Sequence, residues 1–185
     1  MHQIMQILHE DHINVARLLD VIDHVMDQIR QGNVESLQLA CNAMRYMTAY
    51  PDMYHHPTED AVFARLVQRA PETRPVIEQL SAEHKVIGET GTVFLKTLGD
   101  SVQQPAEPAR LLQLGPAYID QLREHMNIEE GDVFPIIKVV LSNHDWGLLE
   151  ETLASAVDPL FGPQIQKGYQ DLARVLSDTL SKISK

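Results

Sequence analysis

The chain has 185 residues, a length typical of one domain or of one domain with an extension. Hydrophobic residues make up 44% of it and charged residues 22%, which excludes a disordered or low-complexity protein. The net charge of -11 would repel a phosphate backbone, so we expect no nucleic-acid partner. The single Cys41 excludes an intramolecular disulfide, and we identify neither a secretory signal nor the roughly 20 apolar residues of a membrane span. We therefore expect a cytoplasmic protein with no membrane partner.

The first two predicted helices differ in their regularity. Over residues 4–30, apolar side chains recur every three or four positions, which predicts one long amphipathic helix that ends near Gly32. The second helix is predicted over residues 35–66 and contains Pro51 and Pro57. Because proline removes a backbone donor and crowds the preceding turn, we expect this helix to be kinked or locally unwound.

The next two predicted helices follow the same pattern. The third covers residues 73–98 and is expected to stop at Gly99. The fourth follows a proline-containing linker and carries its apolar positions over residues 111–129. Gly115 and Pro116 predict a kink or a restart within it.

Two shorter helical segments are predicted after residue 141. Ser142 and Asp145 have the spacing of a capping box, and the last helix is expected from about Pro163 to the C-terminus. Without any run typical of a strand, the pattern predicts an all-α protein, with an up-down-up-down four-helix bundle over residues 1–141. We expect residues 142–185 to form a helical extension that either packs on the bundle or makes a homodimer contact.

Polar residues occupy positions on all four predicted helices where apolar residues would be expected. Four are histidines, and two are glutamates that follow a histidine by four positions and so share its helical face. The six are His12, His55, Glu59, His84, His125 and Glu129. The two halves of the chain repeat this arrangement, which indicates a duplicated helical hairpin.

Buried carboxylates must be neutralised, because leaving one unpaired in a core costs several kcal/mol. Two divalent or trivalent cations would neutralise the predicted pair, and mixed imidazole and carboxylate donors suit Fe, Mn or Zn. A lone buried histidine is more often a hydrogen-bonded core residue, but four on four helices favour a metal site.

Other interpretations of these residues are weaker. A ferritin-like site uses Glu-x-x-His, whereas here the order is reversed and the spacing is four. A metal-free helical adaptor is the alternative from a different class of protein. His9 is a candidate neighbour or substitute ligand, and His56, Asp60 and Glu130 are expected beside the ligands or facing solvent.

Four motifs follow one another over about residues 1–141. They are Asp11-His12; His55-His56-Pro57-Thr58-Glu59-Asp60 with Val62-Phe63; Glu83-His84; and His125 with Glu129-Glu130 and Phe134-Pro135. In order and spacing they resemble the hemerythrin-like, or HHE cation-binding, family. The resemblance implies a non-heme di-iron centre inside a four-helix bundle. It implies four histidines as terminal ligands and two glutamates, Glu59 and Glu129, as bridges, with Mn or Zn as substitutes for iron.

One position departs from the oxygen-carrying members, which have a second histidine one turn after the ligand of the third helix. Here Gly88 stands four residues after His84. The sequence is thus more similar to four-histidine members that serve in nitrosative-stress and iron–sulfur-cluster repair, or in iron and oxygen sensing. We expect a protein that binds or reacts with nitric oxide, dioxygen or peroxide. A reversible dioxygen carrier or iron store is the alternative, and enzyme status is open because no separate acid or base is identifiable.

Overall fold

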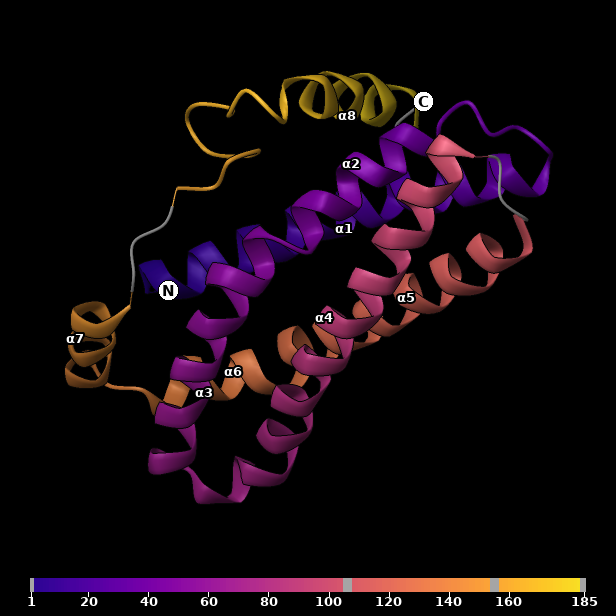
Figure 1. Cartoon of the computed structure of the whole chain (residues 1–185). Coiled ribbons are helices and arrows are strands. Elements are labelled where there is room, and N and C mark those ends of the chain that lie inside the picture. The colour runs from indigo at the N-terminus through magenta and orange to yellow at the C-terminus, as the bar shows by residue number, and fades with distance from the viewer. Residues whose placement is uncertain (1, 105–107, 154–156, 184–185) are drawn as a thin grey trace.

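The computed structural model describes residues 2–104, 108–153 and 157–183, with side chains up to residue 178 in the last segment. These residues form helices joined by turns, and no strand occurs among them. The bundle is built from a long first helix, a broken second helix, a long third helix and a fourth that continues through a π-helical turn (Figure 1). Their bounds are α1 (Gln3–Arg30), α2 (Leu37–Met47), η1 (Pro51–His55), α3 (His56–Arg69), α4 (Arg74–Gln103), α5 (Pro108–Ile128), η3 (Glu129–Val133) and α6 (Phe134–Val140).

The predicted break in the second helix is confirmed. It is a π-helical turn, η1, that begins at Pro51, while Pro57 lies in the first turn of α3. Proline is tolerated at a helix start because the amide there would have no partner inside the helix. A single π-helical turn shifts the face that the following residues present, and such turns are frequent at functional sites.

The predicted stop at Gly99 and the predicted restart at Gly115 were wrong, while the alternative of a kink at Gly115 and Pro116 stays a prediction. Helix α4 continues through Gly99 to Gln103, and α5 continues through Gly115 and Pro116 without a restart. Gly99 has no heavy atom near its missing side chain, so it only weakens the helix slightly. Gly115 lies against Met26 and Phe94, and this packing holds α5 in place.

The short 3-10 turn η2 (Pro71–Thr73) joins α3 to α4. The C-terminal helices are α7 (Asn143–Thr152) and α8 (Gln170–Ile183). The capping box of Ser142 and Asp145 is confirmed, whereas the last helix begins at Gln170 and not near Pro163, because residues 157–169 form turns. Figure 1 shows α8 lying across α1 and α2, with α7 at the other end of the bundle.

The apolar core is divided into two clusters. One contains the C-terminal part of α1 with α2, α5, α8 and the C-terminal part of α4, and the other contains the start of α1 with α3, α6, α7 and the start of α4. A layer of buried polar side chains separates them, and it contains the six residues singled out above. In the described part of the chain, no helix is both long and apolar enough to cross a membrane.

Candidate metal centre

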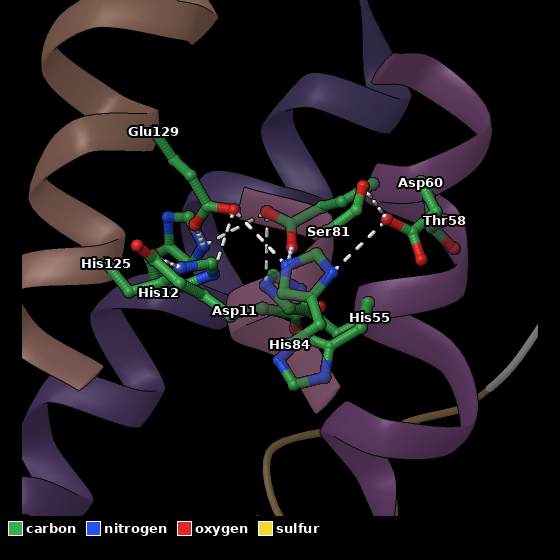
Figure 2. Close-up of polar contacts among 12 residues, drawn as sticks. Asp11, His12, His55, Thr58, Asp60, Ser81, His84, His125 and Glu129 are labelled. Atoms are coloured by element: carbon green, nitrogen blue, oxygen red, sulfur yellow. Dashed lines mark hydrogen bonds and ion pairs between the residues drawn. The ribbon is translucent and has the colours of Figure 1, made fainter. Parts of the chain in front are cut away.

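The six polar residues predicted to face inward converge in the middle of the bundle (Figure 2). Both glutamates are fully buried, and no histidine among the six is more than 7% exposed. They come from all four bundle helices: His12 from α1, His55 and Glu59 from η1 and α3, His84 from α4, and His125 and Glu129 from α5 and η3. The two π-helical turns therefore lie at the site, one ending at His55 and the other beginning at Glu129.

The six residues form two groups of three. His12, His55 and Glu59 make one group, in which one donor atom of each lies within 4.8 Å of the others. His84, His125 and Glu129 make the second group in the same way. Each group comes from one half of the chain and could hold one metal ion, as the duplicated pattern indicates.

Each glutamate faces both groups with different oxygens. Glu59 Oε1 lies 3.2 Å from His12 Nε2 and 3.3 Å from His55 Nε2, while its Oε2 lies 3.4 Å from His84 Nε2. Glu129 repeats this, with Oε1 3.1 Å from His125 Nε2 and 3.4 Å from His84 Nε2. Its Oε2 lies 3.3 Å from His12 Nε2. Two carboxylates in this arrangement could each contact a cation in both groups.

Most of the inward-facing atoms have no hydrogen-bond partner among the described residues. They include the Nε2 atoms of His12, His84 and His125, and all four carboxylate oxygens of Glu59 and Glu129. Buried polar atoms are rarely left without a partner, because the loss of hydration is then uncompensated. Two cations would use every one of these donors, so the residues fit a dinuclear metal site.

The outward nitrogen of each imidazole faces a carboxylate. His12 Nδ1 donates to Glu130 at 2.9 Å, His55 Nδ1 to Asp11 at 3.1 Å and His125 Nδ1 to Glu83 at 2.8 Å, and His84 Nδ1 lies 3.3 Å from Asp60. Such a pair fixes the tautomer and aims the opposite nitrogen, Nε2, at the site. Two of these four pairs join the two halves of the chain, since Asp60 faces His84 and Glu130 faces His12.

The neighbouring carboxylates favour the protonated form of two histidines in the site, His84 and His55. Burial lowers the pKa of His84, but Asp60, Glu129 and Glu59 outweigh it and raise that pKa to about 11. Burial likewise lowers the pKa of His55, while Glu59 and Asp11 raise it to about 9. Without metal, protons on the imidazoles thus balance the two buried carboxylates.

Three residues expected beside the ligands take different places. His9 is exposed and its Nδ1 donates to Glu130 at 2.8 Å, so it contacts the site only through that carboxylate. His56 is buried, with its ring stacked on that of His84 at 4.3 Å between centroids and its Nδ1 3.3 Å from Asp52. Asp60, which also accepts a hydrogen bond from Ser81, is half exposed.

Sequence reasoning did not assign roles to Asp11 and Glu83. Their pairing with His55 and His125 is visible only once the helices are packed. The signal available in the sequence is the repeat, since an acidic residue directly precedes His12 and His84 in the two halves.

Two cavities reach the site from outside. A groove of about 660 Å³ runs beside His84 and His56 and over Gly88. A second cavity of about 230 Å³ is lined by Asp11 and His55 together with Tyr50 and Tyr54. Each half of the site thus has one histidine, His84 or His55, that lines a cavity.

A sequence profile of the Hemerythrin HHE cation binding domain matches residues 3–137. The matched range covers the bundle as far as the middle of α6 and includes all six buried residues, and the chain belongs to this family. Comparisons with curated proteins and with solved structures gave no match. Membership implies that the domain binds metal cations, and the two groups of donors could hold them.

Proposed function

We propose that the protein binds two iron ions and reacts with a small ligand such as nitric oxide, dioxygen or peroxide. In this proposal, His12 and His55 hold one ion and His84 and His125 hold the other. Glu59 and Glu129 bridge the two. The supporting observation is that each carboxylate directs one oxygen to each group of histidines, at 3.1 to 3.4 Å.

Iron is the metal that the proposal favours, with Mn or Zn as substitutes that the same donors would accept. Imidazole and carboxylate together suit these borderline ions better than a soft thiolate site or an all-oxygen calcium site would. The two clusters of apolar side chains on either side of the polar layer exclude bulk water from the donors. A bound iron pair would supply redox chemistry toward the small ligand.

The protein's own residues favour reaction over simple carriage. Each group offers two imidazoles and shares two carboxylates, so the protein supplies four donors to each ion. Gly88, one turn after His84, contributes no fifth imidazole and leaves the adjacent groove open. The unfilled coordination positions are available to a ligand, and we propose a reactive or sensing protein in the cytoplasm that responds to nitrosative or oxidative stress.

Metal content tests the assignment of the ligands. Protein purified without an affinity tag and reconstituted with iron should contain two irons per chain and absorb in the near-ultraviolet. His84→Ala should lose metal and melt at a lower temperature, since the metal compensates the buried carboxylates. His24→Ala, an exposed histidine of α1, is the matched control and should keep both. A full metal load in His84→Ala would remove that residue from the ligand set.

Exposure to dioxygen separates reaction from carriage. Anaerobically reduced protein should be oxidised rapidly and should not return to its starting spectrum on degassing. A long-lived oxygenated spectrum that reverses on degassing would instead establish a carrier.

A further inference from the structure

Four of the five tyrosines form a continuous row that begins beside the metal centre. Tyr46, Tyr50 and Tyr54 are spaced by four residues across the end of α2 and into η1. The centroid of the Tyr50 ring lies 5.6 Å from that of Tyr46 and 5.6 Å from that of Tyr54. Tyr169, in the turn before α8, meets Tyr46 edge-on at 5.8 Å.

The inner end of the row touches the site described above. Tyr50 and Tyr54 line the 230 Å³ cavity together with His55 and with Asp11, the carboxylate that accepts from His55 Nδ1. Burial raises the pKa of Tyr50, and the negative charge of Asp11 raises it further. The phenol of Tyr50 is therefore electrostatically coupled to the carboxylate that orients a proposed metal ligand.

The middle of the row has a fixed acceptor for a proton. Tyr46 is almost fully buried, and its hydroxyl donates to Asp158 Oδ2 at 2.6 Å. The other oxygen of Asp158 accepts from the backbone amides of Leu160 and Phe161, which holds the carboxylate in place. A phenol gives up an electron far more readily when its proton can leave at the same time. The row ends at Tyr169, which is partly exposed.

We propose that this tyrosine row carries single electrons from the surface at Tyr169 to the metal centre, so that the protein reduces peroxide with electrons from a donor too large to enter the site. The inference rests on the proposed function, because it requires a redox-active metal pair and peroxide as the oxidant. Phenylalanine at position 46 would pack equally well, whereas the hydroxyl of Tyr46 requires a polar partner, which is the half-buried carboxylate of Asp158.

The electrons and protons of the proposed reaction balance. Hydrogen peroxide takes up two electrons and two protons, its O–O bond breaks, and two waters form. Each electron leaves Tyr46 through Tyr50 toward the site, while the phenolic proton passes to Asp158 and a neutral phenoxyl radical remains. A one-electron donor such as a phenol or ascorbate then reduces the radical through Tyr169, and the proton returns from Asp158. Two donors are each oxidised by one electron and release one proton, which matches the two protons consumed.

The test uses the full chain loaded with iron and mixed with hydrogen peroxide in the absence of any donor. Rapid freezing and electron paramagnetic resonance should detect a tyrosyl radical, whose signal narrows when the protein is made with ring-deuterated tyrosine. Tyr46→Phe and Tyr50→Phe keep the aromatic packing and should lose most of this signal. Tyr118→Phe removes a buried tyrosine of α5 that lies outside the row but lines the small cavity at the site with His125 and Glu129, and it should keep the signal if the row carries the electron.

A second measurement locates the surface end of the row. With a radical-trapping reagent present, peptide mass spectrometry should find the adduct on Tyr169, and Tyr46→Phe should abolish it. Circular dichroism and iron content of each variant check that the fold and the site are retained.

The possible results distinguish a failure of the proposed tyrosine relay from a failure of the proposed metal site. If iron binds and is oxidised by peroxide but no tyrosyl radical forms, the relay is wrong while the proposed function stands. The same conclusion follows if Tyr118→Phe loses the radical and Tyr46→Phe keeps it. If no iron binds to the wild-type chain, both proposals fail.

Discussion

Each inward-facing imidazole is oriented by a carboxylate on another helix. Asp11 of α1 holds His55, and Glu83 of α4 holds His125, through bonds of 3.1 and 2.8 Å. A carboxylate in this position also makes the imidazole a stronger donor. The role of these two acids in the proposed metal site can be measured separately from that of the ligands.

Asp11→Asn and Glu83→Gln should each weaken metal binding by roughly 10- to 100-fold, the usual effect of removing such a partner. The two losses should be similar, because the residues occupy equivalent places in the two halves. Metal-competition titration measures them, with Glu10→Gln, an exposed neighbour on α1, as the control. Unchanged affinity in both variants would show that the carboxylates do not support the site.

Metal binding should weaken as the pH falls, because metal and protons compete for the same imidazoles. The raised pKa values of His84 and His55, about 11 and about 9, mean that both carry protons at neutral pH in the metal-free chain. Metal uptake should therefore release protons into a weakly buffered solution, which a pH indicator detects. Uptake without proton release would contradict the charge pairing described here.

The folded state of the metal-free chain should become less stable as the pH rises above neutrality. A histidine whose pKa is raised by folding stabilises fully below its unfolded value, near 6.5, and this contribution is lost as the pH rises through the folded value. The loss should therefore begin near pH 6.5 and be complete near pH 9 for His55 and near pH 11 for His84. Thermal unfolding of metal-free protein across this range measures it, with the iron-loaded protein as the comparison.

The burial and convergence of the six proposed ligands could be predicted from sequence, because each interrupts an apolar helix face where a polar residue is costly. The supporting acids could not, since an acidic residue beside a histidine on the outer face is equally typical of a solvated position. Asp11 and Glu83 acquire their roles only from the packing of α1 against η1 and of α4 against α5. The groove over Gly88 likewise depends on the placement of Asp52, whose carboxylate lies 3.5 Å from where a side chain at Gly88 would begin.

At the scale of the helices, glycines gave a misleading signal. Gly99 and Gly115 both lie inside continuous helices, yet for different reasons. A glycine within a helical pattern marks the end of a helix only if no packing contact compensates its low helix propensity. Such contacts cannot be identified from the sequence. Pro51 was more informative, because the break there follows from the geometry of the residue itself, although α5 continues through Pro116.

The two glycines should respond oppositely to alanine. Gly99→Ala has open space around the new methyl group and should raise the free energy of unfolding by about 0.5 to 1 kcal/mol. Gly115→Ala would place the methyl group 2.5 Å from Met26 Sδ and 3.1 Å from Phe94 Cζ. The resulting overpacking should exceed the gain in propensity and lower that free energy by about 1 kcal/mol. Urea unfolding of the pair measures both, and stabilisation by Gly115→Ala would show that Met26 moves aside freely.

At the scale of the molecule, the C-terminal residues extend the core of the bundle. Leu172 and Leu176 of α8 are 1% and 4% exposed and belong to the same cluster as the buried side chains of α1 and α2. At the other end, Asp145 of α7 accepts hydrogen bonds from Arg65 and Arg69 of α3. The division into a metal-binding bundle over residues 1–141 and an extension over 142–185, and the homodimer, remain predictions.

A chain that ends at Gly168 should keep its metal and lose stability. It retains every proposed ligand but uncovers the apolar surface beneath Leu172 and Leu176, so we expect a lower melting temperature and self-association. Sedimentation of the full and shortened chains measures the association. A dimeric full chain with a monomeric shortened chain would instead assign α8 to a homodimer contact.

The four carboxylates that face the outward imidazole nitrogens are of different types in the two halves of the chain. The first half supplies aspartates at both supporting positions, Asp11 and Asp60, and the second supplies glutamates, Glu83 and Glu130. Asp11 and Glu83 each face a histidine of their own half, whereas Asp60 and Glu130 each face a histidine of the other half. Each group of proposed ligands therefore has one imidazole that faces an aspartate and one that faces a glutamate. In the proposed site, the supporting carboxylates would therefore give neither ion an advantage in binding or in reduction.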